Sequence, residues 1–104
     1  MNEHEKVRTA INALYKSVGI SYTFDGEINE QVAKVFGQML VDIRKCSAAY
    51  IWVPRPTGSV ASIGWIAKNF TQSVIHKFQS SQSFTCARAR ILQYKSQLII
   101  ASVG

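Results

Sequence analysis

Residues 29–43 read NEQVAKVFGQMLVDI, and this stretch decides the fold class. Asn29 and Glu30 suit the cap and the first turn of a helix. The apolar residues that follow recur at intervals of three and four, which is the spacing of one helix face. They are Val32, Val35, Phe36, Met39, Leu40 and Ile43. The stretch therefore predicts an amphipathic helix that buries one side.

The same periodicity precedes this segment. An apolar stripe runs through residues 7–18, Asn2 can cap it, and Glu5 stands three residues after the cap. Gly19 follows the last apolar position, as is typical just past a helix end. We expect a first helix here.

Two further stripes lie downstream, over residues 63–78 and 84–98. Ser83 is the expected cap of the last helix. Pro54 and Pro56 require the second helix to end by about residue 53, because proline has no N–H and restricts the residue before it.

These patterns predict one all-α domain over residues 1–104, a compact bundle of four helices. A mixed α+β fold is the alternative, since three segments are rich in β-branched or aromatic residues. Residues 20–24, 49–53 and 97–103 would then pair into a small sheet.

Charge is distributed unevenly along the chain. The last 62 residues, 43–104, hold eight Lys or Arg and no Asp or Glu, whereas the first 42 hold six acids and four bases. A segment of one sign attracts anionic partners such as nucleic acid, acidic protein or anionic lipid. We therefore expect a small basic binding protein, with nucleic acid as the first candidate.

The expected contacts combine cations with aromatic rings, because Lys and Arg neutralise phosphates while aromatic faces stack on bases. An ordinary solvated helix face is the competing interpretation, since such a face also carries Lys, Gln and Asn. The candidate binding residues are Trp52, Arg55, Trp65, Lys68, Arg88, Arg90 and Lys95.

A second hypothesis is a protein–protein adaptor or inhibitor that acts through the helix expected over residues 63–78 and the apolar C-terminal tail. Residues 98–103 read LIIASV, and three consecutive large aliphatic side chains cannot all face one small core. We expect this tail to be covered by a second copy in a homodimer. Alternatively, the tail packs within the monomer.

Catalysis receives little support from the sequence, and an enzyme is the less favoured interpretation. Cys86 near a helix start and His76 could act as a thiol enzyme, which is a distant alternative. No spacing typical of a metal site or a phosphate loop occurs, so no cofactor is expected.

The cysteines and the hydropathy bear on location. Cys46 and Cys86 are too few and too widely spaced for a dense disulfide framework, so we expect reduced thiols. The first residues lack the pattern of a secretory signal, and no apolar run approaches the length of a transmembrane segment. A cytoplasmic protein is expected.

Overall fold

The computed structural model describes residues 2–46 and 81–104. In this part of the chain, helices α1 (Glu3–Ser17), α2 (Glu30–Arg44) and α4 (Ser81–Val103) are present and no residue is in a strand. The all-α prediction is confirmed for the described residues. The helix expected over residues 63–78 lies outside them, as does the possible strand 49–53.

Helix α1 begins and ends where the sequence predicts. The Asn2 side chain accepts a hydrogen bond from the Glu5 N–H at 2.9 Å. At the other end Gly19 adopts a φ of 75°, which favours glycine. The Gly19 N–H donates to the Lys16 carbonyl at 3.1 Å, and the Ile20 N–H donates to the Tyr15 carbonyl at 2.9 Å. This pair of bonds is a Schellman motif.

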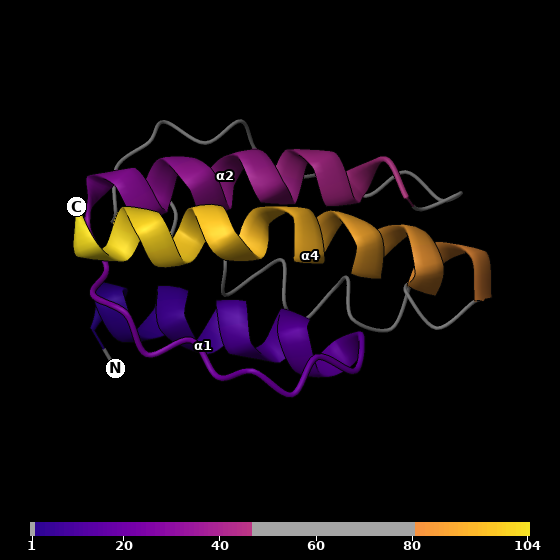
Figure 1. Cartoon of the computed structure of the whole chain (residues 1–104), viewed down its shortest axis with the longest axis horizontal. Coiled ribbons are helices and arrows are strands. Elements are labelled where there is room, and N and C mark those ends of the chain that lie inside the picture. Colours follow the sequence, from indigo (N-terminus) through magenta and orange to yellow (C-terminus); the bar gives the residue numbers. More distant parts are fainter. Residues whose placement is uncertain (1, 47–80) are drawn as a thin grey trace.

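The chain then runs back along α1 without forming helix or strand (Figure 1). The Asn12 side chain holds this connection, residues 18–29, at its middle. Its Nδ2 donates to the Phe24 carbonyl at 3.0 Å and its Oδ1 accepts from the Phe24 N–H at 2.7 Å. Phe24 is therefore bonded to a helix side chain, and the strand that the alternative α+β fold placed at residues 20–24 is absent.

One turn earlier on α1, Arg8 binds the same connection. Its Nε and Nη2 donate to the Gly26 carbonyl at 3.3 and 3.1 Å. Gly26 also lies against α4, since a Cβ at this position would stand 2.5 Å from Ser102 Oγ. The connection thus packs between α1 and the last turn of α4 at Gly26.

Helix α2 starts at the predicted cap. Asn29 Oδ1 accepts from the Val32 N–H at 2.9 Å, while Nδ2 donates to the Ala101 carbonyl at 2.9 Å. One side chain therefore caps α2 and ties its start to the last turn of α4. The helix ends at Arg44, before the prolines, as predicted.

Helix α4 corrects three details of the sequence analysis. It starts at Ser81, so Ser83 is a buried residue inside the helix and not its cap. Residues 97–103 are helical up to Val103, and the alternative of a strand there is wrong. Phe84, expected in the buried stripe, is 36% exposed.

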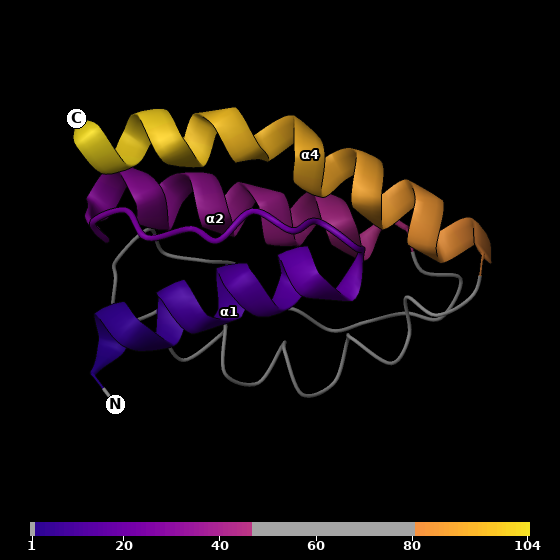
Figure 2. The same cartoon turned by 60° about the horizontal axis from the view of Figure 1, so that its bottom comes forward.

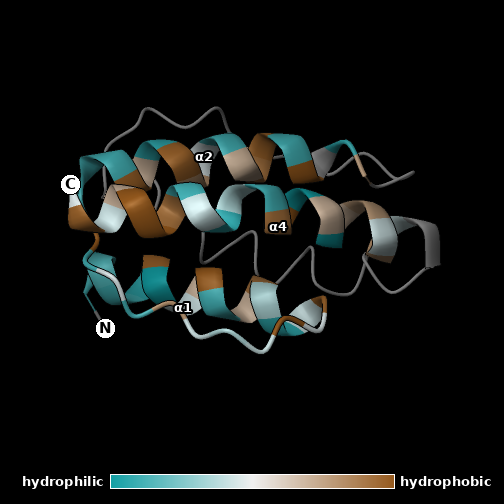
Figure 3. Cartoon of the chain, in the orientation of Figure 1, coloured by the Kyte–Doolittle hydropathy of each residue, from teal (hydrophilic) through white to brown (hydrophobic). Residues whose placement is uncertain are grey.

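The connection makes α1 and α2 point the same way, and α4 runs opposite to both (Figures 1 and 2). The apolar stripes meet in one core, toward which the brown segments of α1 and α2 turn in Figure 3. Burying this area from water is the main favourable term in folding. The largest fully buried side chains are Tyr15, Phe24, Phe36, Ile11, Leu14, Met39, Leu40, Ile43, Ile91 and Leu98.

Candidate functional site

The helix directions place most of the acids of the chain at one end of the molecule. Helices α1 and α2 start at the same end, beside the last turn of α4 (Figure 1). Most of the acids belong to the first turns of these two helices or to the end of the connection between them. We call this end of the molecule the anionic end. It carries five of the six carboxylates of the chain: Glu3, Glu5, Asp25, Glu27 and Glu30.

The opposite end is formed by the last turns of α1 and α2 and the first turns of α4. We call it the cationic end and define it by Lys16, Lys45, Arg88 and Arg90. Lys16, Lys45 and Arg88 are exposed, and Arg90 is half-buried. Lys16 in the last turn of α1 and Lys45 at the C-cap of α2 complement the negative ends of these helix dipoles.

Arg88 and Arg90 lie beyond the first turn of α4, so the dipole of their own helix acts on them only weakly. The neighbouring helix explains Arg88. Its Nε donates to the Val18 carbonyl at 3.2 Å, so it satisfies a backbone group at the C-terminus of α1. Arg88, which the sequence predicted to bind an anionic partner, therefore already donates a hydrogen bond within its own chain.

Arg90 belongs to a polar cluster with Asp42, Lys45 and Tyr94. The Tyr94 hydroxyl donates to Asp42 Oδ2, and Lys45 Nζ lies 3.6 Å from Asp42 Oδ1. The hydrogen bond from Tyr94 holds the pKa of Asp42 below its ordinary value, and the charges of Lys45 and Arg90 act in the same direction. Burial, and then the bond to Asp42, raises the pKa of Tyr94 to about 12. Asp42, the carboxylate at the cationic end, is thus already hydrogen-bonded to Tyr94 and paired with Lys45.

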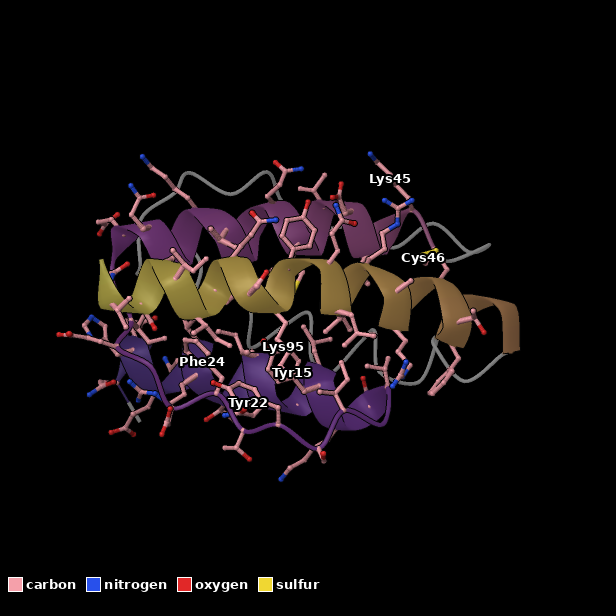
Figure 4. The ribbon with its side chains drawn as sticks, viewed as in Figure 1. Tyr15, Tyr22, Phe24, Lys45, Cys46 and Lys95 are labelled. Carbon is pink, nitrogen blue, oxygen red and sulfur yellow. A yellow bond between two sulfur atoms is a disulfide. The ribbon has the colours of Figure 1, made fainter. Side chains whose placement is uncertain are left out.

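Lys95 lies nearer the middle of α4, on the side that faces the connection (Figure 4). Its Nζ stands 4.5 Å from the centre of the Tyr22 ring, within range of a cation–π interaction. Tyr22 packs in turn against Tyr15, with ring centres 6.1 Å apart. Burial raises the pKa of Tyr15 to about 12.

The structure thus brings together only part of the predicted site. Arg88 and Lys95, seven residues apart, share one side of α4, whereas Arg90 lies on the side of α2 and Asp42. Trp52, Arg55, Trp65 and Lys68 lie outside the described residues.

The cysteines correct another prediction. Cys46, just after α2, and Cys86, in the second turn of α4, form a disulfide with their Cα atoms 5.5 Å apart (Figure 4). The expectation of reduced thiols is wrong. In this state Cys86 offers no nucleophile for the thiol-enzyme alternative, and its proposed base, His76, lies outside the described residues.

Within residues 2–46 and 81–104, no group of three or more His, Cys, Asp or Glu side chains could hold a metal ion. None of the described helices is both long and apolar enough to span a membrane. No protein-family model matches the chain, and comparisons with curated proteins and with solved structures found nothing similar.

Residues that sequence reasoning missed hold the site in place. Asn12 forms two hydrogen bonds to the backbone of Phe24, and the Tyr94 hydroxyl donates to Asp42. Asn29 was predicted as a cap, but its second bond, to the Ala101 carbonyl, was not. An amide on a mostly apolar helix is a weak signal by itself. The helical spacing of the apolar stripe predicted that Tyr94 is buried, but not that its hydroxyl bonds to Asp42.

Removing the disulfide should destabilise the fold. In the loop-entropy treatment, the sequence separation of 40 residues corresponds to about 4 kcal/mol of unfolding free energy. The double variant Cys46→Ser/Cys86→Ser should lose about this amount in urea denaturation. The unreduced native protein, unfolded in urea, should incorporate no iodoacetamide. Alkylation of both cysteines there would contradict the bridge.

Replacing Tyr94 by Phe should lower the free energy of unfolding at pH 7 by about 1–2 kcal/mol, because a half-buried hydrogen bond to a carboxylate is lost. Because the pKa of Asp42 is lower in the folded protein than its ordinary value of 3.8, the ionised carboxylate stabilises the fold at pH values above 3.8. This contribution is lost as the pH falls through the pKa that Asp42 has in the folded protein. The difference between native protein and variant should therefore shrink at pH 3, measured by urea denaturation.

Tyr22→Phe is the control for this experiment, because it keeps the ring beneath Lys95 and does not touch Asp42. It should leave the acid dependence of stability unchanged. An equal loss for Tyr94→Phe at pH 7 and pH 3 would contradict the assigned hydrogen bond.

Proposed function

We propose that the protein is a non-catalytic binding protein that contacts an anionic partner, foremost nucleic acid, through its cationic end. The observation that supports this most strongly is the position of the acids. Five of six lie at the far end of the molecule, and the sixth, Asp42, is held by Tyr94 and Lys45. An approaching phosphate therefore meets few competing carboxylates.

Lys16 and Arg88 are best placed for the first contacts. Both are exposed, and Lys16 stands in the last turn of α1, the helix whose end Arg88 binds. Arg88 uses Nε for the Val18 carbonyl, which leaves other guanidinium N–H groups as donors toward a ligand. The other candidate binding residues, which lie outside the described part of the chain, are Trp52, Arg55, Trp65 and Lys68.

A protein partner is the second candidate. Its support is the apolar surface of α4, where Phe84 is 36%, Leu92 39%, Ile100 68% and Val103 84% exposed. Exposed apolar side chains on one helix favour contact with another protein surface. A homodimer through α4 belongs to this proposal.

A cytoplasmic location stays a prediction from the sequence. The Cys46–Cys86 disulfide argues against it, because such bonds persist in oxidising compartments and are rare in the reducing cytosol.

Charge reversal at the cationic end tests nucleic-acid binding. Lys16→Glu should weaken binding to mixed-sequence DNA and RNA oligonucleotides by at least about threefold, and it should lower the salt slope of log K by up to about one. Fluorescence anisotropy at two salt concentrations measures both quantities. Reversing Arg88 would be less clean, because it would also remove the bond to Val18.

Lys34→Glu is the matched control. Lys34 is also an exposed helix lysine, but it lies near the start of α2, at the anionic end. It should change affinity much less than Lys16→Glu. Equal losses in both variants, or no binding at low salt, would refute the proposed site.

A further inference from the structure

The outward face of α4 has a pattern that neither the core nor the cationic end uses. Exposed or half-buried residues recur there at alternating intervals of four and three, which is the spacing of a coiled-coil seam. We call this face the α4 seam. It consists of Thr85, Ala89, Leu92, Ser96, Ile99 and Val103.

The seam carries no charged residue, although it belongs to a helix face that is turned away from the core. Leu92 is 39% and Val103 is 84% exposed. A solvated helix face ordinarily carries polar and charged side chains. An uncharged seam with this spacing fits against another helix.

We propose that the α4 seam pairs with the same seam of a second copy, and that the two helices run antiparallel about a two-fold axis at the level of residue 94. This inference does not depend on nucleic-acid binding. It specifies the surface and the geometry of the dimer that the exposed tail suggests.

Side-chain size favours the antiparallel arrangement. Within the seam, Ala89 and Ser96 are small, Leu92 and Ile99 are large, and Thr85 and Val103 at its ends are similar in size. Antiparallel pairing about residue 94 sets Thr85 opposite Val103, Ala89 opposite Ile99, and Leu92 opposite Ser96. Two of the three layers, Ala89 with Ile99 and Leu92 with Ser96, then combine a small with a large side chain, which is how helix surfaces interdigitate. The third pairs Thr85 with Val103, which are similar in size. Parallel pairing would set each residue opposite its own copy.

Charge favours the same arrangement. Antiparallel pairing brings the cationic end of each copy beside the anionic end of its partner, whereas parallel pairing brings like ends together. Lys95 flanks the seam near the two-fold axis, but its ammonium group lies over the Tyr22 ring of its own chain. Its charge is thus directed away from the opposing copy.

The mass in solution tests whether the seam pairs. Analytical ultracentrifugation should show a concentration-dependent doubling from 11.6 kDa. Leu92→Glu should raise the dissociation constant at least about tenfold, because it places an acid in the seam on each side of the axis. Gln93→Glu adds the same charge at an exposed position beside the seam and should change it far less.

Circular dichroism shows whether both variants remain folded, as their exposed positions predict. If the native chain stays monomeric at the highest concentrations, or if Leu92→Glu dimerises as well as Gln93→Glu, the proposal is overturned.

Cross-linking tests the orientation. A mixture of Ala89→Cys and Ile99→Cys chains, oxidised and analysed by peptide mass spectrometry, should give mainly the mixed link between positions 89 and 99. Parallel pairing would instead give mainly links between identical positions, and that result would refute the antiparallel geometry. Links that involve Cys46 or Cys86 are separated by their peptide masses.

Discussion

The two hydrogen bonds between the Asn12 side chain and the backbone of Phe24 are the constraint on which the arrangement of helices depends. They hold the connection against α1 halfway along its return. A helix of 15 residues is about 22 Å long, a distance that ten extended residues span easily. Because the connection returns along the whole of α1, α2 starts beside the start of α1 and points the same way.

The separation of charge follows from this parallel pair. Acids favour helix N-termini and cations favour C-termini, so two parallel helices add their polarities where antiparallel helices would cancel them. Helix α4 runs the other way and contributes Arg88 and Arg90 in its first half and no acid. It is joined to α2 at both ends, by Asn29 and Ala101 at the anionic end and by the Cys46–Cys86 disulfide at the cationic end.

Features carried by neighbours in sequence could be predicted. The caps at Asn2 and Asn29 bond to N–H groups three residues away, and the helical stripes depend only on spacing. The connection was harder, because its alternation of apolar and polar residues suits a strand as well as a segment packed on a helix. What decides between them is Asn12, and its distance from Phe24 is set by the fold and not by the sequence spacing.

The candidate site shows the same limit. The sequence predicted the one-sided charge of the C-terminal half, but the partners of the cations are distant in the chain: Arg88 meets Val18, and Lys95 meets Tyr22. The disulfide likewise joins residues that are 40 positions apart, and their proximity follows only from the antiparallel packing of α2 and α4.

Amide hydrogen exchange at Phe24 tests the central claim most directly. Its N–H lies in a connection without helix or strand, so its protection depends on the bond to Asn12 Oδ1. We predict that this amide exchanges as slowly as the core amides of α1, and far more slowly than those of the exposed neighbours Thr23 and Asp25. Exchange of the Phe24 amide at the rate of an unprotected loop would contradict the account.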